Sequence, residues 1–574
     1  MRDLKLVTRR TSGGWLRDLL LLAIVLGIPF FQYLGNLPLI DPDEGRYAEI
    51  PREMLERGDL ITPTLNYVKY FEKPPLLYWL NAASLKLFGM NEFAARLPSA
   101  LCGLLTVLTT YIIARNLYGR RAALIAALIL GTSIGFVLQS RIILTDMLLT
   151  FCLTAAMGAF IVALLREGRR SRALPWYLFY LFCAGAVLAK GLIGIVFPVG
   201  IIFCYLLLSR RWKLLSEMCP GSGILLFLAV TVPWFVAVSV RNPEFARFFF
   251  IHEHFERFTS TVHGRYQPFW FFVPVLLGTM LPWSFFIPGA LVRAWRDRYH
   301  EEGQAGIYLF IWAVVIFLFF SKSQSKLIPY MLPVFPPLAM LIGHRIDIQM
   351  EGRGRELKTA AILLGGTLFV MGAVVLCYYY LPRIDFVMAG MLPDWSEPLR
   401  RIMDSAPPLT GLACLTIGSL FLLQGFGALV TAGQNPLRMI AVVGVVSFLL
   451  EILIPRLILN GINQAESPRD LSLKARSLAG PDTAIVTFGP MQGVSWYLKR
   501  RVMVIGNIDE LEFGSRQGSQ GAWFPDRMTM LNLWDRSHVL IFISKGDLKG
   551  LVKLLNPQPL IKAESGRQLL ISNR

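Results

Sequence analysis

A series of long apolar stretches, separated by short polar segments, does most to limit what this chain can fold into. A helix needs about 20 apolar residues to cross the hydrocarbon core of a bilayer. The chain is 54% hydrophobic and only 17% charged, whereas ordinary soluble domains are about 25% charged. We therefore expect a mainly α-helical, polytopic membrane protein whose thirteen or so transmembrane helices lie at residues 16–36, 94–115, 122–140, 144–165, 174–190, 191–209, 222–240, 268–292, 305–321, 326–344, 359–381, 408–431 and 436–458.

Basic clusters between the apolar stretches predict the orientation in the membrane. They follow the second, fourth, sixth, eighth and tenth stretches, at positions 115–121, 166–172, 210–213, 293–298 and 345–358. Loops rich in Lys and Arg stay on the cytoplasmic side. We therefore expect a cytoplasmic N-terminus, an uncleaved first span and outer-face loops at 37–93, 241–267, 321–326 and 382–407. The net charge of +19 comes mainly from these clusters, which indicate contact with a lipid bilayer and not with nucleic acid.

The composition changes after residue 461. Residues 462–574 contain no spanning stretch, but short β patterns alternate with helical ones, at 483–489, 501–506, 538–544 and 567–572. This alternation is typical of a small α/β domain, here with four strands. We divide the chain into a transmembrane domain, 1–461, and a periplasmic α/β domain, 462–574, with no nucleotide-binding fingerprint. The expected role of the second domain is to cover the outer face, and contact with the substrate is the alternative.

A polar segment at residues 37–79 lies between the first two apolar stretches and carries most of the candidate site. Its first motif, DPDEGRYA, brings Asp43 and Arg46 close to the membrane. Ionisable groups beside hydrocarbon are costly and usually mark the path of a substrate or an ion. Asp43 could be a base or a metal ligand. Alternatively, it caps a helix that begins near Glu44, or the segment is a solvated loop whose charges only keep it in water.

A second acidic residue, Asp146, lies in SRIILTDMLLT, where the predicted third and fourth spans meet the outer face. An aspartate flanked by Leu and Met at this depth either pairs with Arg141 or belongs to a site. Two carboxylates from different spans can share one acceptor, or raise each other's pKa so that one of them acts as a base.

Two further motifs supply cations and histidines to the same face. Lys73 precedes Pro74 and Pro75 in YFEKPPLLYW, and the two prolines fix the chain where the next helix starts. His252 and His254 lie in HEHFERF. Glu72 together with one of these histidines could hold a divalent cation, although two ligands are a weak indication of a metal site. The alternative is that both histidines are structural.

The motif SKSQSKLIPYMLP lies at the outer ends of the predicted ninth and tenth spans. Lys322 and Lys326, with Tyr330, are expected to form a positive patch that suits the phosphate of a lipid. Lys190 ends the predicted fifth span. We expect its side chain to extend to the membrane interface.

The order of these motifs resembles that of the GT-C glycosyltransferases. DPDEGRYA after the first span, then YFEKPPLLYW, the aspartate at 146, HEHFERF and SKSQSKLIPYMLP all fit. Within that superfamily the chain is most similar to the protein O-mannosyltransferase-like group, which contains the bacterial aminoarabinose transferase of lipid A. The span count and the outer α/β domain agree with this resemblance, which covers nearly the whole chain.

The resemblance implies a sugar donor linked to a polyprenyl phosphate, with no nucleotide. It implies catalytic roles for Asp43 and Asp146, and a metal-binding pair formed by Glu72 and His252 or His254. The ion would be zinc, or magnesium or manganese. Contacts with the donor, including its lipid phosphate, are implied for Lys73, Arg46, Tyr47, Tyr70, Arg257 and Tyr330.

We therefore predict a glycosyltransferase of the bacterial inner membrane. Its favoured reaction moves 4-amino-4-deoxy-L-arabinose from undecaprenyl phosphate to lipid A on the periplasmic face. Transfer to a protein or to another glycan is the alternative within the same class. A transporter of lipid-linked sugars is disfavoured because the charges gather at one face and no paired broken-helix repeat surrounds a midplane site. A structural protein would not need acids and cations on converging loops.

Overall fold

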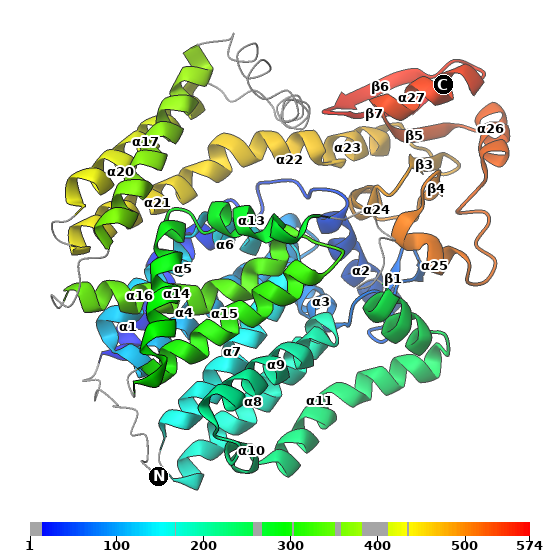
Figure 1. Cartoon of the computed structure of the whole chain (residues 1–574). Coiled ribbons are helices and arrows are strands. Elements are labelled where there is room, and N and C mark those ends of the chain that lie inside the picture. Colours follow the sequence, from blue (N-terminus) through cyan, green and yellow to red (C-terminus); the bar gives the residue numbers. More distant parts are fainter. Residues whose placement is uncertain are drawn as a thin grey trace.

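The structure is a computed structural model that describes residues 14–166, 168–256, 267–300, 303–350, 357–380, 411–432 and 436–574. A large helical bundle carries a small domain, built around a sheet, at one end (Figure 1). The predicted fold class, mainly helical with a small C-terminal α/β domain, is confirmed.

The helices of the bundle follow the apolar stretches of the sequence. Their bounds are α1 Trp15–Phe31, α4 Glu92–Tyr118, α5 Arg120–Gly131, α6 Ile134–Ser140, α7 Thr145–Leu165, α8 Arg169–Lys190, α9 Ile193–Ser209, α10 Leu214–Glu217, α11 Pro220–Arg241, η1 Arg247–Glu256, η2 Phe269–Phe271, α13 Phe272–Thr279, η3 Trp283–Phe286, α14 Ile287–Arg296, η4 Asp297–Tyr299, α15 Gln304–Lys322, η6 Ile328–Val334, α16 Phe335–Met350, α17 Leu357–Tyr380, α20 Gly411–Thr431, α21 Pro436–Ile454 and η7 Pro455–Leu459.

The predicted count of thirteen spans is not confirmed, although every predicted stretch contains helix. Within the described ranges, eight helices are long and apolar enough to cross a bilayer, or up to ten if each of two bent pairs forms one span. Helices α5 and α6 meet at 64°, and the segment expected as one span at 268–292 bends by 115°. Pro282 lies at this second bend, and proline cannot donate the hydrogen bond that would continue a helix.

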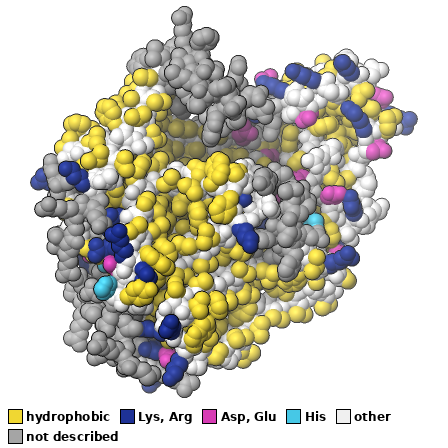
Figure 2. Space-filling model, viewed as in Figure 1, with side chains coloured by type: hydrophobic (Ala, Val, Ile, Leu, Met, Phe, Trp, Pro, Cys, Tyr) yellow, Lys and Arg dark blue, Asp and Glu magenta, His cyan; other side chains and the backbone are white. Residues whose placement is uncertain are grey.

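Apolar side chains cover the outside of the bundle. Leu225 on α11 is 69% exposed and Val240 is 77% exposed, as expected for residues that face lipid tails. Figure 2 shows a broad apolar side face, with Lys and Arg near its lower left edge and over the C-terminal domain. This surface agrees with a multi-span membrane protein.

The polar segment 37–93 folds into ordered structure on the outer face. It forms α2 (Asp43–Arg57), a hairpin of β1 (Thr64–Leu65) and β2 (Val68–Lys69), and α3 (Leu76–Phe88). Asp43 is the first residue of α2, the N-cap position is Pro42, and no side chain caps the helix. The prediction that Asp43 caps a helix beginning at Glu44 is therefore wrong. The solvated-loop alternative is also wrong, because residues 44–54 are buried.

A buried ion pair attaches α2 to the bundle. The Arg96 guanidinium on α4 donates to both Glu44 carboxylate oxygens, at 2.7 and 2.6 Å. Arg96 also donates to the carbonyl oxygens of Leu34, Leu37 and Pro38. A bidentate pair of this kind fixes orientation as well as distance, so the start of α2 has a defined place at the end of α1 and α4.

Residues 462–574, all of them described, form the C-terminal domain together with the end of α22. Its helices are α22 Asn460–Glu466, α23 Arg469–Leu478, α24 Gln492–Leu498, η8 Asp509–Leu511, α25 Glu512–Ser515, α26 Arg527–Arg536, α27 Lys545–Leu551 and η9 Val552–Leu554, and its strands are β3 Ala484–Phe488, β4 Met503–Ile505, β5 Val539–Ser544, β6 Leu560–Ser565 and β7 Gln568–Ser572.

The sheet of this domain has five strands in the order β4-β3-β5-β7-β6, parallel across β4-β3-β5 and antiparallel across β5-β7-β6. The prediction of four strands missed β6. This strand lies at the edge of the sheet, and Leu560 and Ile561 on it are 50% and 59% exposed. Because neither of its faces is fully buried, its sequence lacks the apolar pattern that marks the other strands.

The C-terminal domain is joined to the segment 37–93 by specific polar contacts. The Gly493 N–H at the start of α24 donates to Asp41 Oδ1 at 2.7 Å. Asn66 in the hairpin exchanges two hydrogen bonds with the backbone of Val502. A Cβ at Gly45 would lie 2.4 Å from the Gly493 nitrogen, so glycine at this position lets α24 approach α2 closely. Figure 1 shows α24 beside α2.

Asp41 predicts a pH dependence of this junction. Burial of its carboxylate, reinforced by the charge of Glu44, raises the pKa of Asp41 to about 7, and its Oδ2 has no hydrogen-bond partner among the described residues. The folded protein therefore binds an extra proton between the unfolded pKa and about 7. Its free energy of unfolding is expected to fall by up to about 2 kcal/mol between pH 5.5 and pH 8.

The measurement is the apparent melting temperature of wild type and Asp41→Asn in detergent at pH 5.5 and pH 8. Asparagine keeps the acceptor for Gly493 and cannot ionise, so the variant is expected to lose less stability at pH 8 than the wild type. Burial also raises the pKa of Glu53, to about 8, but Glu53 acts equally in both proteins. Identical pH profiles for the two proteins would contradict the assignment to Asp41.

Candidate active site

Arg46 connects the first turn of α2 to the C-terminal domain. Its guanidinium forms ion pairs with Asp43, three residues earlier, and with Glu510 in η8. The side chain of Arg46 is 8% exposed, whereas that of Asp43 is 52% exposed. A guanidinium held between two carboxylates is well fixed in orientation. Asp43 therefore presents a carboxylate that a substrate can reach from a defined position.

Glu510 is a site residue that the sequence did not reveal. Besides pairing with Arg46, its Oε2 accepts a hydrogen bond from the Tyr70 hydroxyl at 3.0 Å. The surrounding sequence, NIDELEFG, has no feature that sets this acid apart from others in the domain. The C-terminal domain thus contributes a side chain to the group around Asp43, in addition to covering it.

Buried tyrosines form the floor beneath Arg46. The ring of Tyr47 stacks on that of Tyr78 with centroids 6.2 Å apart, and the Arg46 guanidinium lies 4.9 Å from the Tyr47 centroid. Burial raises the pKa of both Tyr47 and Tyr70 well above the usual range. Both phenols therefore stay protonated, so that they can donate hydrogen bonds to an anionic ligand.

Lys73 lies between two carboxylates on separate segments. Its ammonium is 3.4 Å from Glu253 Oε2 on η1 and 3.8 Å from Glu72 Oε2, and it donates to the Glu72 carbonyl oxygen at 2.9 Å. The side chain of Lys73 is 13% exposed. The prolines that follow hold this lysine at the start of α3, as the sequence predicted. Lys73 therefore supplies a fixed positive charge at the outer face.

Asp146 pairs with Lys190 and not with Arg141. The Asp146 carboxylate at the start of α7 accepts a hydrogen bond from the Lys190 ammonium at the end of α8. This ammonium also lies 4.5 Å from the ring centroid of Tyr330 on η6. Arg141 instead donates to the carbonyl oxygens of Pro29 and Gln32. The expectations that Asp146 pairs with Arg141 and that Lys190 extends to the interface are both wrong.

The predicted positive patch in SKSQSKLIPYMLP does not form. Lys326 is 5% exposed, and its ammonium donates to the carbonyl oxygens of Ser323 and Gln267. Lys322 is exposed. Tyr330 instead stacks on Phe320 at 4.8 Å and faces Lys190. The polar backbone of the turn at 321–326 uses Lys326 as a local donor, which the sequence pattern could not show.

These groups surround Tyr47. The Tyr47 phenol lies within electrostatic range of Arg46 and of the carboxylates of Asp43, Glu72 and Asp146. The structure thus brings the three acidic positions, contributed by α2, the segment before α3 and the start of α7, to one region. Arg257 lies outside the described residues, as does the side chain of His254.

The predicted metal pair remains a prediction. Among the described residues, no three His, Cys, Asp or Glu side chains come close enough together to hold a metal ion. The ring of His252 lies against Phe248 at 5.1 Å, and Lys73 is the nearest cation to Glu72 that the structure describes. A positive ammonium beside Glu72 competes with a second cation, so these residues alone do not make a strong metal site.

Two known families match the chain. The family described as dolichyl-phosphate-mannose-protein mannosyltransferase matches residues 15–249, which include α1 to α11 and the start of η1. The aminoarabinose transferase C-terminal domain matches residues 472–573.

Individual relatives match over most of the chain. It is 33% identical to the undecaprenyl phosphate-alpha-4-amino-4-deoxy-L-arabinose arabinosyl transferase of Pseudomonas aeruginosa, over 86% of each protein. It is 34% identical to the enzyme of that name from Erwinia tasmaniensis, over 70% of this chain and 73% of the relative. The crystal structure of ArnT from Cupriavidus metallidurans bound to undecaprenyl phosphate is 28% identical and superposes with a TM-score of 0.81, covering 98% of this chain and 99% of the other.

Proposed function

Because the chain belongs to the family of undecaprenyl phosphate-α-4-amino-4-deoxy-L-arabinose arabinosyl transferases, we propose that it transfers 4-amino-4-deoxy-L-arabinose from undecaprenyl phosphate to a phosphate of lipid A. The protein is a membrane glycosyltransferase, and a related structure holds undecaprenyl phosphate. The observation that carries the proposal is the group of fixed charges around Tyr47 at one end of the bundle.

The charges suit the two ends of the reaction. The acceptor oxygen attacks the anomeric carbon, the bond between that carbon and the phosphate oxygen of the donor breaks, and undecaprenyl phosphate leaves with the electron pair. Lys73 and Arg46 are positioned to stabilise negative charge on the departing phosphate, as fixed cations do in other transferases. Tyr70, together with Tyr47, can donate hydrogen bonds to the same oxygens.

Asp43 is proposed to act on the acceptor or the sugar. A hydroxyl acceptor would need a base, and a partly exposed carboxylate at the first residue of α2 can take its proton. A lipid A phosphate is already anionic, and then Asp43 would hold the amine of the sugar or orient the acceptor. Asp146 is proposed as a second carboxylate of the site, positioned by Lys190 and by the ring of Tyr330 beside it.

The orientation follows from the same geometry. The basic clusters lie at the end of the bundle opposite α2, where Asp18 on α1 pairs with Arg115 and Arg120. We propose that this end is cytoplasmic. Residues 462–574 then form a periplasmic domain, and 1–461 form the transmembrane domain with its site at the periplasmic face of the inner membrane.

The test is reconstitution of the purified chain with undecaprenyl-phosphate aminoarabinose and lipid A. Mass spectrometry is expected to find lipid A carrying the added sugar, and undecaprenyl phosphate released in equal amount. A protein acceptor in a parallel reaction tests the alternative substrate. Movement of the donor across vesicles with no new glycosidic bond would instead identify a transporter and overturn the proposal.

A divalent ion at Glu72 and His252 is proposed as a separate question, and no step of the mechanism depends on it. If the ion is required, removal with a chelator is expected to abolish transfer, and zinc, magnesium or manganese should each be tested for recovery. Glu72→Gln with His252→Ala should then make the chain insensitive to added metal, as measured by metal content after dialysis. Full activity at a metal content near zero would eliminate the ion.

A further inference from the structure

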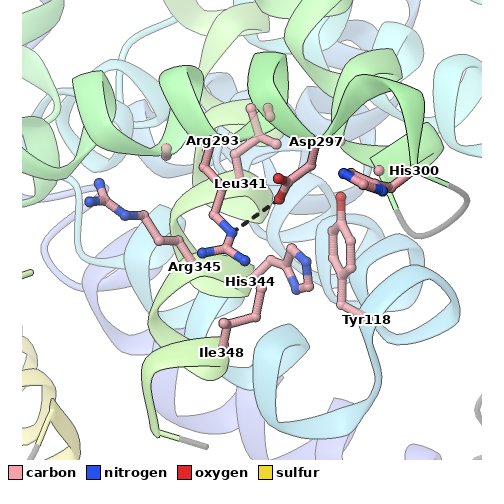
Figure 3. Close-up of a pocket in the computed structure, with 12 residues that line it drawn as sticks. Tyr118, Arg293, Asp297, His300, Leu341, His344, Arg345 and Ile348 are labelled. Atoms are coloured by element: carbon pink, nitrogen blue, oxygen red, sulfur yellow. Dashed lines mark ion pairs between the residues drawn. The ribbon is translucent and has the colours of Figure 1, made fainter. Parts of the chain in front are cut away.

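A cavity of about 230 Å³ lies among the helix ends far from the candidate active site. It is enclosed by the end of α4, the end of α14 with η4, the start of α15 and the end of α16 (Figure 3). Helix α15 runs for 19 residues from this end to Lys322 at the outer face, a distance of roughly 28 Å for a regular helix. The cavity is therefore separate from the group around Tyr47, and the proposed reaction does not use it.

A buried hydroxyl faces this cavity. Tyr118, the last residue of α4, is 8% exposed, and among the described residues its hydroxyl has no hydrogen-bond partner. Its ring is held by stacking on His344 of α16, with centroids 3.7 Å apart and planes 12° apart. Figure 3 shows the hydroxyl directed toward the side of the cavity where Asp297 and His300 lie. A buried hydroxyl without a partner costs stability, so a ligand that accepts its proton would be favoured here.

A buried guanidinium group faces the same space. Arg293 Nε lies 3.2 Å from Asp297 Oδ2 in an ion pair, yet within the described part of the chain this N–H makes no hydrogen bond. Figure 3 shows the Arg293 guanidinium between Asp297 and the side chains of α16. The charge of Arg293 is thus partly balanced by Asp297, while hydrogen-bonding capacity remains unused.

A second arginine adds positive charge. Arg345 on α16 lines the cavity and is 8% exposed. It lies against α14 so closely that a Cβ at Gly289 would be 1.5 Å from its Nη1, so the glycine makes room for the guanidinium. Two arginines against one aspartate leave one positive charge in excess among the described lining residues, before any charge on the two histidines.

We propose that this cavity binds a phosphate group, with Arg293 and Tyr118 as direct donors and Arg345 supplying further positive charge. Unsatisfied donors select a ligand that has only acceptors, and the excess positive charge selects an anion over a cation. A phosphate meets both conditions, and arginine forks match its geometry. The volume is many times what one water needs, so a phosphate with a small attached group fits.

Two sources could supply this phosphate. The cavity lies at the ends of spanning helices, where lipid headgroups meet the protein, and basic pockets at such positions bind anionic headgroups. A free phosphate from solution would have the same chemistry. The lipid source assumes the orientation proposed above, whereas the site itself depends on neither that orientation nor the transfer reaction.

The experiment titrates the purified full-length chain in detergent with phosphatidylglycerol, with phosphatidylcholine and with inorganic phosphate. Native mass spectrometry measures lipid binding, and calorimetry measures phosphate binding. The variants are Arg293→Gln and Tyr118→Phe, which keeps the ring stacked on His344. The control is Arg296→Gln, which removes the same charge from the same helix end, is exposed and does not line the cavity.

Arg293→Gln is expected to weaken binding about tenfold to a hundredfold, and Tyr118→Phe about threefold to tenfold, the range for a charged and a neutral hydrogen bond. Arg296→Gln should stay within about twofold. Variant-sensitive binding of phosphatidylglycerol identifies a lipid source, and variant-sensitive binding of inorganic phosphate identifies a soluble one. Equal affinity of wild type, Arg293→Gln and Tyr118→Phe for all three probes would overturn the proposal and leave water in the cavity.

Discussion

Replacing Asp43 with asparagine is expected to lower the rate of sugar transfer by about a hundredfold to ten-thousandfold. Asparagine has the same size and can still accept a hydrogen bond from Arg46, but it cannot take a proton or hold an ammonium by charge. The exposed half of the Asp43 carboxylate is the part that this change disables. The measurement is the initial rate of product formation by mass spectrometry, with donor and acceptor each at saturating concentration.

The matched control is Asp470→Asn, which removes an exposed carboxylate from the same outer end of the molecule but outside the site. Its rate should remain within about twofold of wild type, because exposed charges contribute little on their own. The apparent melting temperature of both variants should stay close to that of the wild type. An Asp43→Asn rate within threefold of wild type would remove Asp43 from the chemistry, even if transfer itself is demonstrated.

The positions of the helices could be predicted because hydrophobicity acts locally. A stretch such as 145–165 is apolar on every side, and α7 occupies Thr145–Leu165. Bends were harder to predict, since the breaks at 132–133 and 280–282 are short and interrupt the apolar pattern only briefly. The strand β6 was missed for the opposite reason, because its two faces are both partly exposed and leave no alternation to detect.

The partners of the site residues could not be predicted, although several of the residues could. Asp43, Lys73 and Asp146 stand out because a charge beside hydrocarbon needs a reason. Nothing in the sequence pairs Asp146 with Lys190, or Arg46 with Glu510, because each pair joins segments that meet only after the bundle and the C-terminal domain have packed together. Periodicity reports which face of an element is buried, and it carries no information about which distant side chain that face meets.

Asp41 illustrates the same limit within one motif. It lies two residues before Asp43 in DPDEGRYA, and the pattern gives no ground for treating the two aspartates differently. In the structure, Asp41 accepts the Gly493 N–H and has a buried oxygen, while Asp43 is half exposed at the start of α2. The C-terminal domain makes this distinction, since α24 covers one carboxylate and leaves the other open to a substrate.

Lys73→Gln is expected to lower kcat/KM for the lipid-linked donor by about a hundredfold to a thousandfold, the range for loss of one fixed group that stabilises developing negative charge. The leaving group gains charge as the bond to the sugar breaks, and glutamine offers it a dipole in place of a full charge. Glu253 and Glu72, which approach the ammonium at 3.4 and 3.8 Å, would then lose their shared cation and repel an anionic phosphate. Steady-state rates at several donor concentrations measure the effect.

Lys69→Gln provides the comparison for this variant, because Lys69 lies four residues earlier and pairs with Glu244 at a side-chain exposure of 34%. A general loss of positive charge at the outer face would affect both variants equally, whereas loss of a group that acts on the leaving phosphate affects only Lys73→Gln. Lys73→Arg restores the charge but spreads it over a planar group, so it is expected to recover part of the rate and most of the stability. Equal rates for Lys73→Gln and Lys69→Gln, with both proteins folded, would show that Lys73 only balances Glu72 and Glu253.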